Sequence, residues 1–357
     1  MAKKRIVFIG GGAVGAYVAA HLVRGGEDVT VFDPWPENVA AINAKGIEVT
    51  GTTQQEHFIQ AVDTRPLSEI GQLWQEAPVD IAFVCMKSYD TEWATSMIAP
   101  YLAPDGFVVS LQNCINEETI AGVVGWGRTV GCIASLIAVD LHAPGQVRRN
   151  VPLGGETHTV FRVGEPHGRV TQRVEHIAQL LRHADSSKTT TNLWGERWSK
   201  LAANAMRNAL AASTGLSGNA GDENEGQRRF ALKLAGETVK VGTAHGNVFE
   251  MVYGLPPEQL IAANDGDAAA LKALEDELLG RGIKKGSGHL PSMGQDIRKK
   301  RRTEIDYING FVARKGAELG IEAPANAAIT ELVKQVERGE VQQGPDAIVA
   351  MVKSVLG

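Results

Sequence analysis

The feature that most constrains this chain is a glycine-rich turn near its N-terminus. It reads Gly10, Gly11, Gly12, Ala13, Val14 and Gly15. The turn directly follows the apolar run Arg5–Ile9 and opens the helical pattern Ala13–Arg24. In this strand–turn–helix context, the G-x-G-x-x-G spacing predicts a dinucleotide site, in which the second glycine lets the backbone approach a pyrophosphate. The N-terminus of the following helix stabilises the negative charge. A turn that binds no ligand is the alternative.

The pattern around this turn predicts a doubly wound α/β domain. Apolar runs alternate with helical patterns through about the first 140 residues. The predicted strands are Arg5–Ile9, Asp28–Phe32, Gly46–Thr50, Asp80–Met86 and Phe107–Gln112, and the first two predicted helices are Ala13–Arg24 and Glu37–Ala44. Strands that polar residues do not interrupt are buried on both faces, which indicates a parallel sheet covered by helices.

The second half of the chain predicts a different architecture. A β-rich stretch over residues 129–163 and a helix over residues 170–183 lead to a polar segment near residues 186–191. After that segment nearly every pattern is helical. The predicted helices are Trp194–Ala212, Arg228–His245, Pro257–Ala263, Ala268–Leu279, Thr303–Leu319 and Asn326–Arg338. We therefore predict two domains: a doubly wound α/β domain over residues 1–186 that binds a dinucleotide, and an all-α domain over residues 187–357.

Composition excludes several classes of function. The chain has 36 basic and 41 acidic residues and a net charge of -5, without the basic footprint of a nucleic-acid-binding protein. The basic run Arg298–Arg302 is interpreted as a solvated helix start, because no aromatic residues are interleaved with it. No apolar stretch reaches the roughly 18 residues that a membrane span requires. The three cysteines are isolated in the sequence, which argues against a zinc site and favours a reducing cytoplasm.

The residue at the end of the second strand discriminates between nicotinamide cofactors. Asp33 lies where an acidic residue accepts hydrogen bonds from the adenosine ribose. A 2′-phosphate would meet a like charge there, and the following Pro34–Glu37 segment offers no arginine to bind it. The sequence predicts NAD rather than NADP as the preferred cofactor. Asp33 as a simple turn residue before proline is the alternative.

A second informative segment lies in the first helix of the α domain. Lys200, Asn204 and Asn208 follow one another at intervals of four, so they align along one helical face. A lysine and two amides on one stripe can hold a polar substrate. A solvated face, or a hydrogen-bond network between domains, explains the same pattern equally well.

Together with other motifs, this segment resembles the ketopantoate reductase family. The C-terminal signature is the strongest match, with Ser292-Met-Gly-Gln-Asp-Ile-Arg followed by Arg302-Thr-Glu304-Ile-Asp-Tyr-Ile-Asn-Gly310. The glycine motif, Leu111-Gln112-Asn113 and Trp198-x-Lys200-x-x-x-Asn204 also match. Order and spacing agree over roughly residues 5 to 337. The resemblance implies a Rossmann-type domain followed by a helical domain.

The resemblance also implies roles for individual residues. Lys200 matches the general acid that protonates the substrate carbonyl, and Glu304 matches the active-site glutamate that orients this lysine and touches the cofactor. Lys87 matches a lysine near the nicotinamide ribose, and its place after a parallel strand suits a ligand site. The positions expected to bind substrate besides Lys200 are Asn113, Asn204, Asn208 and Ser292, and Asn113 is also placed beside the cofactor.

The chain departs from the family pattern at three single residues, and it is longer than typical members around residues 280–290 and after Glu340. Asp33 contrasts with the basic residue of NADPH-using members. Cys114 follows Asn113 where glycine is common, and its side chain is expected to restrict the backbone or narrow the cleft. A small buried apolar residue is the favoured interpretation of Cys114. Arg207 replaces a usually apolar residue; it either binds an additional anionic or hydroxylated group or pairs with a carboxylate, and we favour the pairing slightly.

The predicted function is hydride transfer between NAD(P) and a carbonyl or secondary alcohol carbon of a small polar substrate, with reduction of 2-dehydropantoate to pantoate as the leading reaction. An NAD-dependent catabolic dehydrogenase for a different secondary alcohol or hydroxy acid is one alternative. A non-catalytic NAD(H) sensor is another, although the Lys200 and Glu304 pair argues against it. We expect a cytoplasmic protein, compatible with a homodimer, that has a small-molecule substrate and no metal, membrane or nucleic-acid partner.

Overall fold

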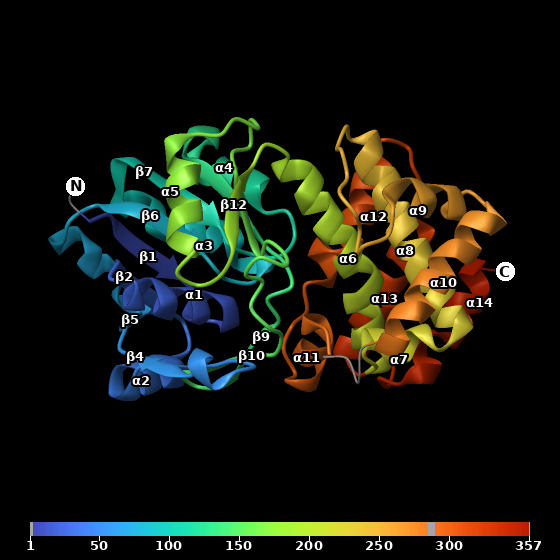
Figure 1. The fold of residues 1–357 in the computed structure, drawn as a ribbon, viewed down its shortest axis with the longest axis horizontal. Helices are drawn as coiled ribbons and strands as arrows, with labels where there is room; N and C mark the ends of the chain where they lie inside the picture. The colour runs from blue at the N-terminus through green and yellow to red at the C-terminus, as the bar shows by residue number, and fades with distance from the viewer. Residues whose placement is uncertain (1–2, 285–289, 357) are drawn as a thin grey trace. The chain divides into compact units, whose positions relative to one another are not determined.

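The computed structural model describes residues 3–284 and 290–356. They form two compact units, one ending at Leu193 and the other starting at Trp194 (Figure 1). Ser187–Thr190, which we placed after the domain boundary, forms strand β12 at the edge of the first unit's sheet. The division between the compact units therefore follows this strand.

The main sheet of the first unit has eight strands in the order β12-β11-β8-β7-β6-β1-β2-β5. Its strands are β1 (Arg5–Ile9), β2 (Asp28–Asp33), β5 (Asp63–Pro66), β6 (Val79–Val84), β7 (Leu102–Ser110), β8 (Thr129–Ala134), β11 (Phe161–Gly164) and β12 (Ser187–Thr190). Every neighbouring pair is parallel except β8 and β11. The predicted doubly wound architecture is confirmed.

Helices cover both faces of this sheet, as Figure 1 shows. Successive residues of a strand point to opposite faces. Ile6 and Phe8 therefore join a core that α1 (Ala13–Arg24) and α5 (Gln172–Leu181) complete. Val7 and Ile9 join a second core on the opposite face. The elements that complete this second core are α3 (Thr91–Ile98), α4 (Glu117–Val124) and the 3₁₀ helix η2 (Leu67–Gln75).

The strand predicted at Gly46–Thr50 exists but belongs to a different sheet. It is β3 (Ile47–Thr50), reached through α2 (Pro36–Lys45). It lies in a four-stranded sheet of order β4-β3-β10-β9. The other members are β4 (Phe58–Gln60), β9 (Val139–Ala143) and β10 (Gln146–Arg149). β3 pairs in parallel with β10, about a hundred residues later in the chain. The residues of β3 alone therefore do not indicate which sheet the strand joins.

The described residues of the second unit form helices joined by loops, with one isolated bridge between Val252 and Leu255. Its helices are α6 (Leu193–Thr214), α7 (Gly218–Asp222), α8 (Glu225–Ala244), α9 (Pro257–Asn264), α10 (Ala268–Lys284), α11 (Ser292–Arg298), α12 (Asn309–Glu318), α13 (Pro324–Glu337) and α14 (Val349–Leu356). α6 begins one residue before the division between the units. None of the described helices has the length and apolar character needed to cross a membrane.

One predicted helix of this unit is interrupted. The segment Thr303–Leu319 contains a 3₁₀ turn, η6 (Ile305–Tyr307), and α12 starts only at Asn309. Ile308, between the two, has φ -108° and ψ -91°, which lies outside helical geometry. Glu304 therefore lies at the start of a short turn and not inside a continuous helix. The short helices α7 and α11 were missed, because five and seven residues show too little periodicity.

A partly buried histidine, His21, is expected to make the stability of the first unit sensitive to pH. His21 of α1 lies between the rings of Tyr17 and Phe58, with centroid distances of 4.5 and 4.9 Å. Burial, with a smaller contribution from the charge of Arg24, lowers the pKa of His21 to about 4. In the unfolded chain its pKa is near 6.5, so the unfolded state takes up the proton first as pH falls. Between pH 6.5 and 4 the folded state should thus lose about 3 kcal/mol.

The substitution His21→Leu tests this dependence. We expect the free energy of unfolding of His21→Leu to fall less steeply than that of the wild type between pH 6.5 and 4, as measured by urea denaturation. His57→Leu removes an exposed histidine from the same unit and is the matched control. The interpretation is wrong if His21→Leu and the wild type show the same slope.

Candidate functional site

The glycine turn lies where three strands converge. The N–H of Gly10 donates to the carbonyl of Phe32 in β2 over 2.8 Å. Gly10 has φ +106°, a conformation that residues with a side chain rarely adopt. A Cβ at Gly10 would also lie 2.9 Å from the Met86 sulfur and 3.1 Å from the Cys85 carbonyl carbon. The turn therefore packs directly against the chain that leaves β6.

Gly12 and Gly15 serve different purposes in the turn. A Cβ at Gly15 would lie 2.2 Å from the carbonyl oxygen of Gly10, so this glycine permits close packing of α1 on the turn. A Cβ at Gly12 would meet nothing within 4 Å among the described residues. Gly12 caps α1, whose first turn has no acidic residue and no side-chain cap. An open backbone at a helix N-terminus fits a pyrophosphate.

Asp33 is built into the same turn. Its side chain accepts the Gly11 N–H over 2.6 Å and the Trp35 N–H over 2.9 Å. It is 5% exposed. These contacts fix the carboxylate at the end of β2, beside the glycine turn. Asp33 thus makes the turn contacts that the alternative interpretation expects, and its carboxylate is held beside the glycine turn.

Asn38 is a residue of this turn that the sequence did not reveal. Its Nδ2 donates to the Gly11 carbonyl over 3.1 Å, and its Oδ1 accepts the Gly145 N–H over 2.8 Å. The side chain is completely buried in α2. Asn38 thereby connects the glycine turn to the loop between β9 and β10. An asparagine within an otherwise ordinary helix pattern gave no signal of this role.

Lys87 and Asn113 follow the adjacent strands β6 and β7 at the carboxyl edge of the sheet. The loops that carry them are tied together by two amides. Gln112 donates to the Met86 carbonyl over 2.7 Å and to the Thr91 hydroxyl over 2.9 Å. Asn116 donates to the Ser88 hydroxyl over 3.2 Å and to the Asn113 carbonyl over 2.8 Å.

Because β1, β6 and β7 are neighbours in the parallel sheet, this edge brings together the loops of Gly10, Lys87 and Asn113. The carboxyl edge of a doubly wound sheet is the usual ligand site.

Cys114 has a left-handed backbone conformation, which favours glycine. Its φ is +66° and its side chain is 4% exposed. A residue with a Cβ in this left-handed region costs roughly 1–2 kcal/mol, so the packing around the thiol must hold it there. The low exposure of the Cys114 side chain agrees with its interpretation as a small buried apolar residue. Cys85, which directly follows β6, is partly buried, and this burial raises the pKa of its thiol far above the ordinary value.

The polar stripe of the helical unit lies on α6. Lys200 and Asn204 are partly buried, and Asn208 is 5% exposed. The Asn208 Oδ1 accepts a hydrogen bond from the Ser292 hydroxyl over 3.3 Å, and the Met293 N–H lies 3.5 Å from the same oxygen. Asn208 and Ser292, which are 84 residues apart, are thus brought together where α11 begins.

The segment that carries Glu304 is anchored to the same helix. Glu304 is 4% exposed, and its carbonyl accepts the N–H groups of Tyr307 and Ile308. Five residues later, the Asn309 amide donates to the Ala205 carbonyl in α6 over 3.2 Å and to Asn326 Oδ1 over 2.9 Å. Ala205 directly follows Asn204. The structure therefore ties the Glu304 segment to the stripe through Asn309.

This anchor continues into α8 and α13. The Glu237 carboxylate accepts the backbone N–H groups of Ala325 and Asn326, each over 3.0 Å, and the Asn326 side chain over 2.9 Å. Burial raises the pKa of Glu237, although these donors oppose the shift. No pattern in the sequence indicated Glu237 or Asn326, whereas Asn309 lies inside the matched C-terminal signature.

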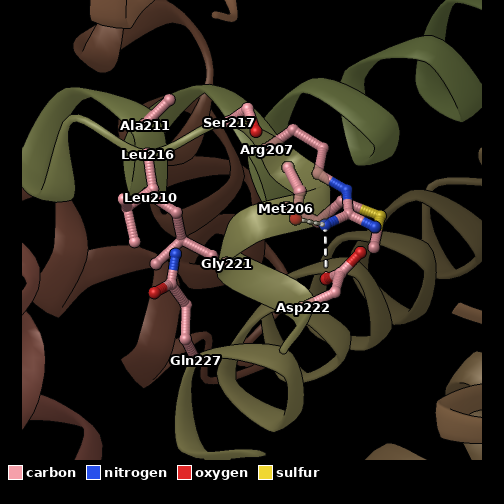
Figure 2. Close-up of a pocket in the computed structure, with 10 residues that line it drawn as sticks. Met206, Arg207, Leu210, Ala211, Leu216, Ser217, Gly221, Asp222 and Gln227 are labelled. Carbon is pink, nitrogen blue, oxygen red and sulfur yellow. Dashed lines mark hydrogen bonds and ion pairs between the residues drawn. The ribbon is translucent and has the colours of Figure 1, made fainter. Parts of the chain in front are cut away.

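Arg207 pairs with a carboxylate, as the favoured interpretation expected. Its Nη1 lies 2.6 Å from Asp222 Oδ1 and 3.4 Å from the Gly218 carbonyl. The guanidinium also lies over the Tyr253 ring, 4.8 Å from its centroid. Figure 2 shows the Asp222 carboxylate pointing at the guanidinium beside a small pocket. The pocket is lined by Met206, Arg207, Leu210, Ala211, Leu216, Ser217, Gly218, Gly221, Asp222 and Gln227.

Comparison with known proteins identifies both halves of the chain. Residues 6–160 match the family model described as ketopantoate reductase PanE/ApbA, and residues 192–337 match its C-terminal model. A 2-dehydropantoate 2-reductase of Archaeoglobus fulgidus is 29% identical over 95% of this chain and 100% of its own. The corresponding protein of Pyrococcus horikoshii is 29% identical over 93% of this chain and 97% of its own.

Two solved structures have a similar fold over nearly the whole chain. A PanE/ApbA family ketopantoate reductase from Ralstonia eutropha superimposes with a TM-score of 0.75 and 25% identity, covering 94% of this chain and 99% of its own. D-mandelate dehydrogenase, in a complex with NADH and anilino(oxo)acetate, has a similar fold, with a TM-score of 0.76 and 21% identity over 94% of this chain and 99% of its own.

Proposed function

The chain belongs to the ketopantoate reductase family, and we propose that it is an NAD(P)-dependent oxidoreductase that reduces the carbonyl carbon of a small 2-oxo acid, with 2-dehydropantoate as the leading substrate. One observation carries this proposal. Lys200, Asn204 and Asn208 lie along one face of α6, with Asn208 bonded to Ser292, in a chain whose first unit holds an open glycine turn at the carboxyl edge of a parallel sheet.

The first unit would hold the cofactor, which supplies the hydride when bound. The open backbone at Gly12 and the N-terminus of α1 would bind the pyrophosphate. Asp33 would accept hydrogen bonds from the adenosine ribose. Lys87 and Asn113, at the ends of β6 and β7, would bind nearer the nicotinamide.

The second unit would supply the proton. In this mechanism Lys200 donates a proton from its Nζ to the carbonyl oxygen, and its positive charge stabilises the developing alkoxide. Glu304 orients Lys200. Asn204, Asn208 and Ser292 bind the polar groups of the substrate, and the Asn208–Ser292 hydrogen bond fixes two of these side chains relative to each other. Such preorganisation lowers the entropic cost of reaching the reactive geometry.

Turnover tests the proposal directly. NADH oxidation is followed by absorbance with 2-dehydropantoate and with a panel of other 2-oxo acids. We expect saturable turnover of at least one of them. Tight NADH binding without turnover of any 2-oxo acid would contradict the proposal and favour a protein that only senses NADH.

Asp33 should make the enzyme prefer NADH. The Gly11 and Trp35 N–H groups hold its carboxylate, so it cannot easily turn away from a 2′-phosphate. Two like charges about 4 Å apart repel by roughly 1–4 kcal/mol near a protein surface. We therefore expect NADPH to bind at least tenfold more weakly than NADH in a fluorescence titration. Equal or tighter binding of NADPH would show that Asp33 has only its turn role.

A further inference from the structure

The guanidinium of Arg207 has one edge that the described residues do not pair. Nη1 binds Asp222 and approaches the Gly218 carbonyl. Nε and Nη2 are shielded from solvent and have no acceptor in the part of the chain that the structure describes. The side chain as a whole is only 10% exposed. A buried charged group that lacks hydrogen-bond partners is unfavourable, so this edge requires an explanation.

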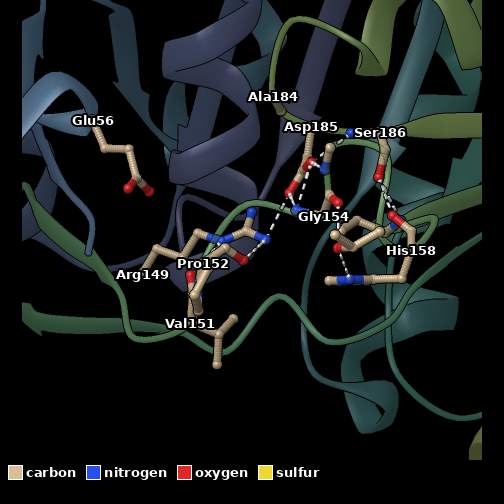
Figure 3. A network of polar contacts seen from close by, with 12 residues as sticks. Glu56, Arg149, Val151, Pro152, Gly154, His158, Ala184, Asp185 and Ser186 are labelled. Atoms are coloured by element: carbon tan, nitrogen blue, oxygen red, sulfur yellow. Dashed lines mark hydrogen bonds and ion pairs between the residues drawn. The ribbon is translucent and has the colours of Figure 1, made fainter. Parts of the chain in front are cut away.

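Two other buried arginines of the chain are fully paired. Arg228 has the same 10% exposure as Arg207, and its three nitrogens bind Glu275 and the Asp222 carbonyl over 2.7–3.1 Å. Arg149 is completely buried, and its nitrogens bind Tyr17 and the carbonyl of Val151. They also bind Asp185 and the carbonyl of Pro152 (Figure 3). The unpaired edge is thus a property of the Arg207 site and not of buried arginines in this fold.

The position of Arg207 relates its pocket to the polar stripe of α6. Arg207 is seven residues and Ala211 eleven residues after Lys200, so both lie close to the line of Lys200 and Asn204. A Cβ on Gly294 of α11 would lie 3.2 Å from the Ala211 carbonyl, so the helix that carries Ser292 also packs against this end of the stripe. The pocket therefore continues the stripe toward the C-terminus of α6.

The lining of the pocket suits a short chain that ends in an anion. Leu210, Ala211 and Leu216 provide apolar surface in the same pocket, away from the Arg207 guanidinium in the view of Figure 2. The Tyr253 ring covers one face of the guanidinium, and Asp222 occupies Nη1. What remains is the planar edge with Nε and Nη2, two parallel donors that match the two oxygens of a carboxylate. Because both nitrogens are shielded from solvent, a carboxylate reaches them only when a neighbouring side chain moves. The unbranched side chain of Met206, which also lines the pocket, can make this room.

We propose that Arg207 binds a second carboxylate of the substrate, at the end distant from the reacting carbonyl. This inference rests on the proposed function, reduction of a 2-oxo acid, and it changes the leading substrate to a 2-oxo diacid, because 2-dehydropantoate has a single carboxylate. Among 2-oxo acids of equal length, the chain selects the one with a terminal carboxylate. The Cα atoms of Lys200 and Arg207 are about 10 Å apart along the helix axis, and helical side chains lean toward the N-terminus, so acids of five or six carbons are the appropriate probes.

Matched substrates test this selection. Values of kcat/KM are compared between 2-oxoglutarate and 2-oxopentanoate, and between 2-oxoadipate and 2-oxohexanoate. In the wild type we expect at least one dicarboxylate to be favoured tenfold or more. Arg207→Leu should lower this selectivity ratio by roughly 10- to 100-fold, as expected for loss of a charge-assisted bidentate pair. Arg207→Lys keeps the charge without the paired donors and should have an intermediate ratio.

Arg229→Leu is the matched control, because Arg229 lies in the same unit with a side chain that is 44% exposed and paired with Glu225 and Glu275. We expect its selectivity ratio to equal that of the wild type. The inference is overturned if the wild type does not favour either dicarboxylate, or if Arg207→Leu and Arg207→Lys both keep the wild-type ratio.

Binding of glutarate separates this inference from the proposed function. Glutarate has no carbonyl to reduce, and its affinity for the full chain with NADH present is measured by calorimetry. Weaker binding to Arg207→Leu than to the wild type, without turnover of any 2-oxo acid, supports the carboxylate site and contradicts the proposed function. Turnover of 2-oxo acids without dicarboxylate preference supports the proposed function and contradicts the site.

Discussion

Replacing Lys200 with alanine is expected to lower kcat for carbonyl reduction by roughly three orders of magnitude while NADH still binds. In the proposed mechanism Lys200 both donates the proton and stabilises the alkoxide. General acid catalysis contributes roughly 10²–10⁴-fold, and removal of one electrostatic stabiliser costs roughly 10²–10³-fold. The effect should appear in kcat and much less in the Kd of NADH, because the glycine turn belongs to the other unit.

Lys240→Ala provides the control for this experiment. Lys240 lies on α8 of the same unit, is 43% exposed and pairs with Asp265. Its removal should leave kcat within a factor of about two, since surface ion pairs contribute little to stability. If Lys200→Ala folds and retains wild-type kcat, the assignment of Lys200 as proton donor is wrong.

The second large effect is expected from two alanine substitutions in the glycine turn, which should separate folding from cofactor binding. Gly12→Ala places a methyl group in open space, and the φ of -68° is accessible to alanine. Its melting temperature should equal or slightly exceed that of the wild type. We expect its Kd for NADH to rise at least tenfold, because the methyl group would occupy the approach of the pyrophosphate.

Gly15→Ala should behave differently. Its methyl group would lie 2.2 Å from the Gly10 carbonyl oxygen, a backbone atom that cannot move without shifting α1 from the turn. Overpacking of this kind costs roughly 1–3 kcal/mol, so the melting temperature should fall by several degrees and NADH binding should also weaken. Equal NADH affinity of Gly12→Ala and the wild type would place the pyrophosphate elsewhere.

The strongest local patterns predicted the fold well. The buried apolar runs at β1, β6 and β7 became neighbouring parallel strands, and the helical patterns of the second half became helices. The errors arose where pairing partners are distant or elements are short. β3 joined a sheet with β10, and Ser187–Thr190 became an edge strand because it pairs with β11. No local pattern encodes such pairing.

The candidate site was predictable where chemistry requires particular residue types at fixed spacing. The glycine turn, Asp33 and the Lys200, Asn204 and Asn208 stripe are of this kind. The residues that hold these groups in place were not predictable. Asn38 and Glu237 act through hydrogen bonds to backbone groups far away in the sequence. Only the folded structure brings these donors and acceptors together.

We expect this chain to transfer hydride from a nicotinamide cofactor to the carbonyl carbon of a 2-oxo acid. NADH carrying deuterium at the transferred position, mixed with 2-dehydropantoate or the best 2-oxo acid of the panel, tests it most directly. Mass spectrometry of the product should show one deuterium bound to C2, formed at the rate of NADH oxidation. A product without deuterium, or NADH that persists with every 2-oxo acid, would contradict this expectation.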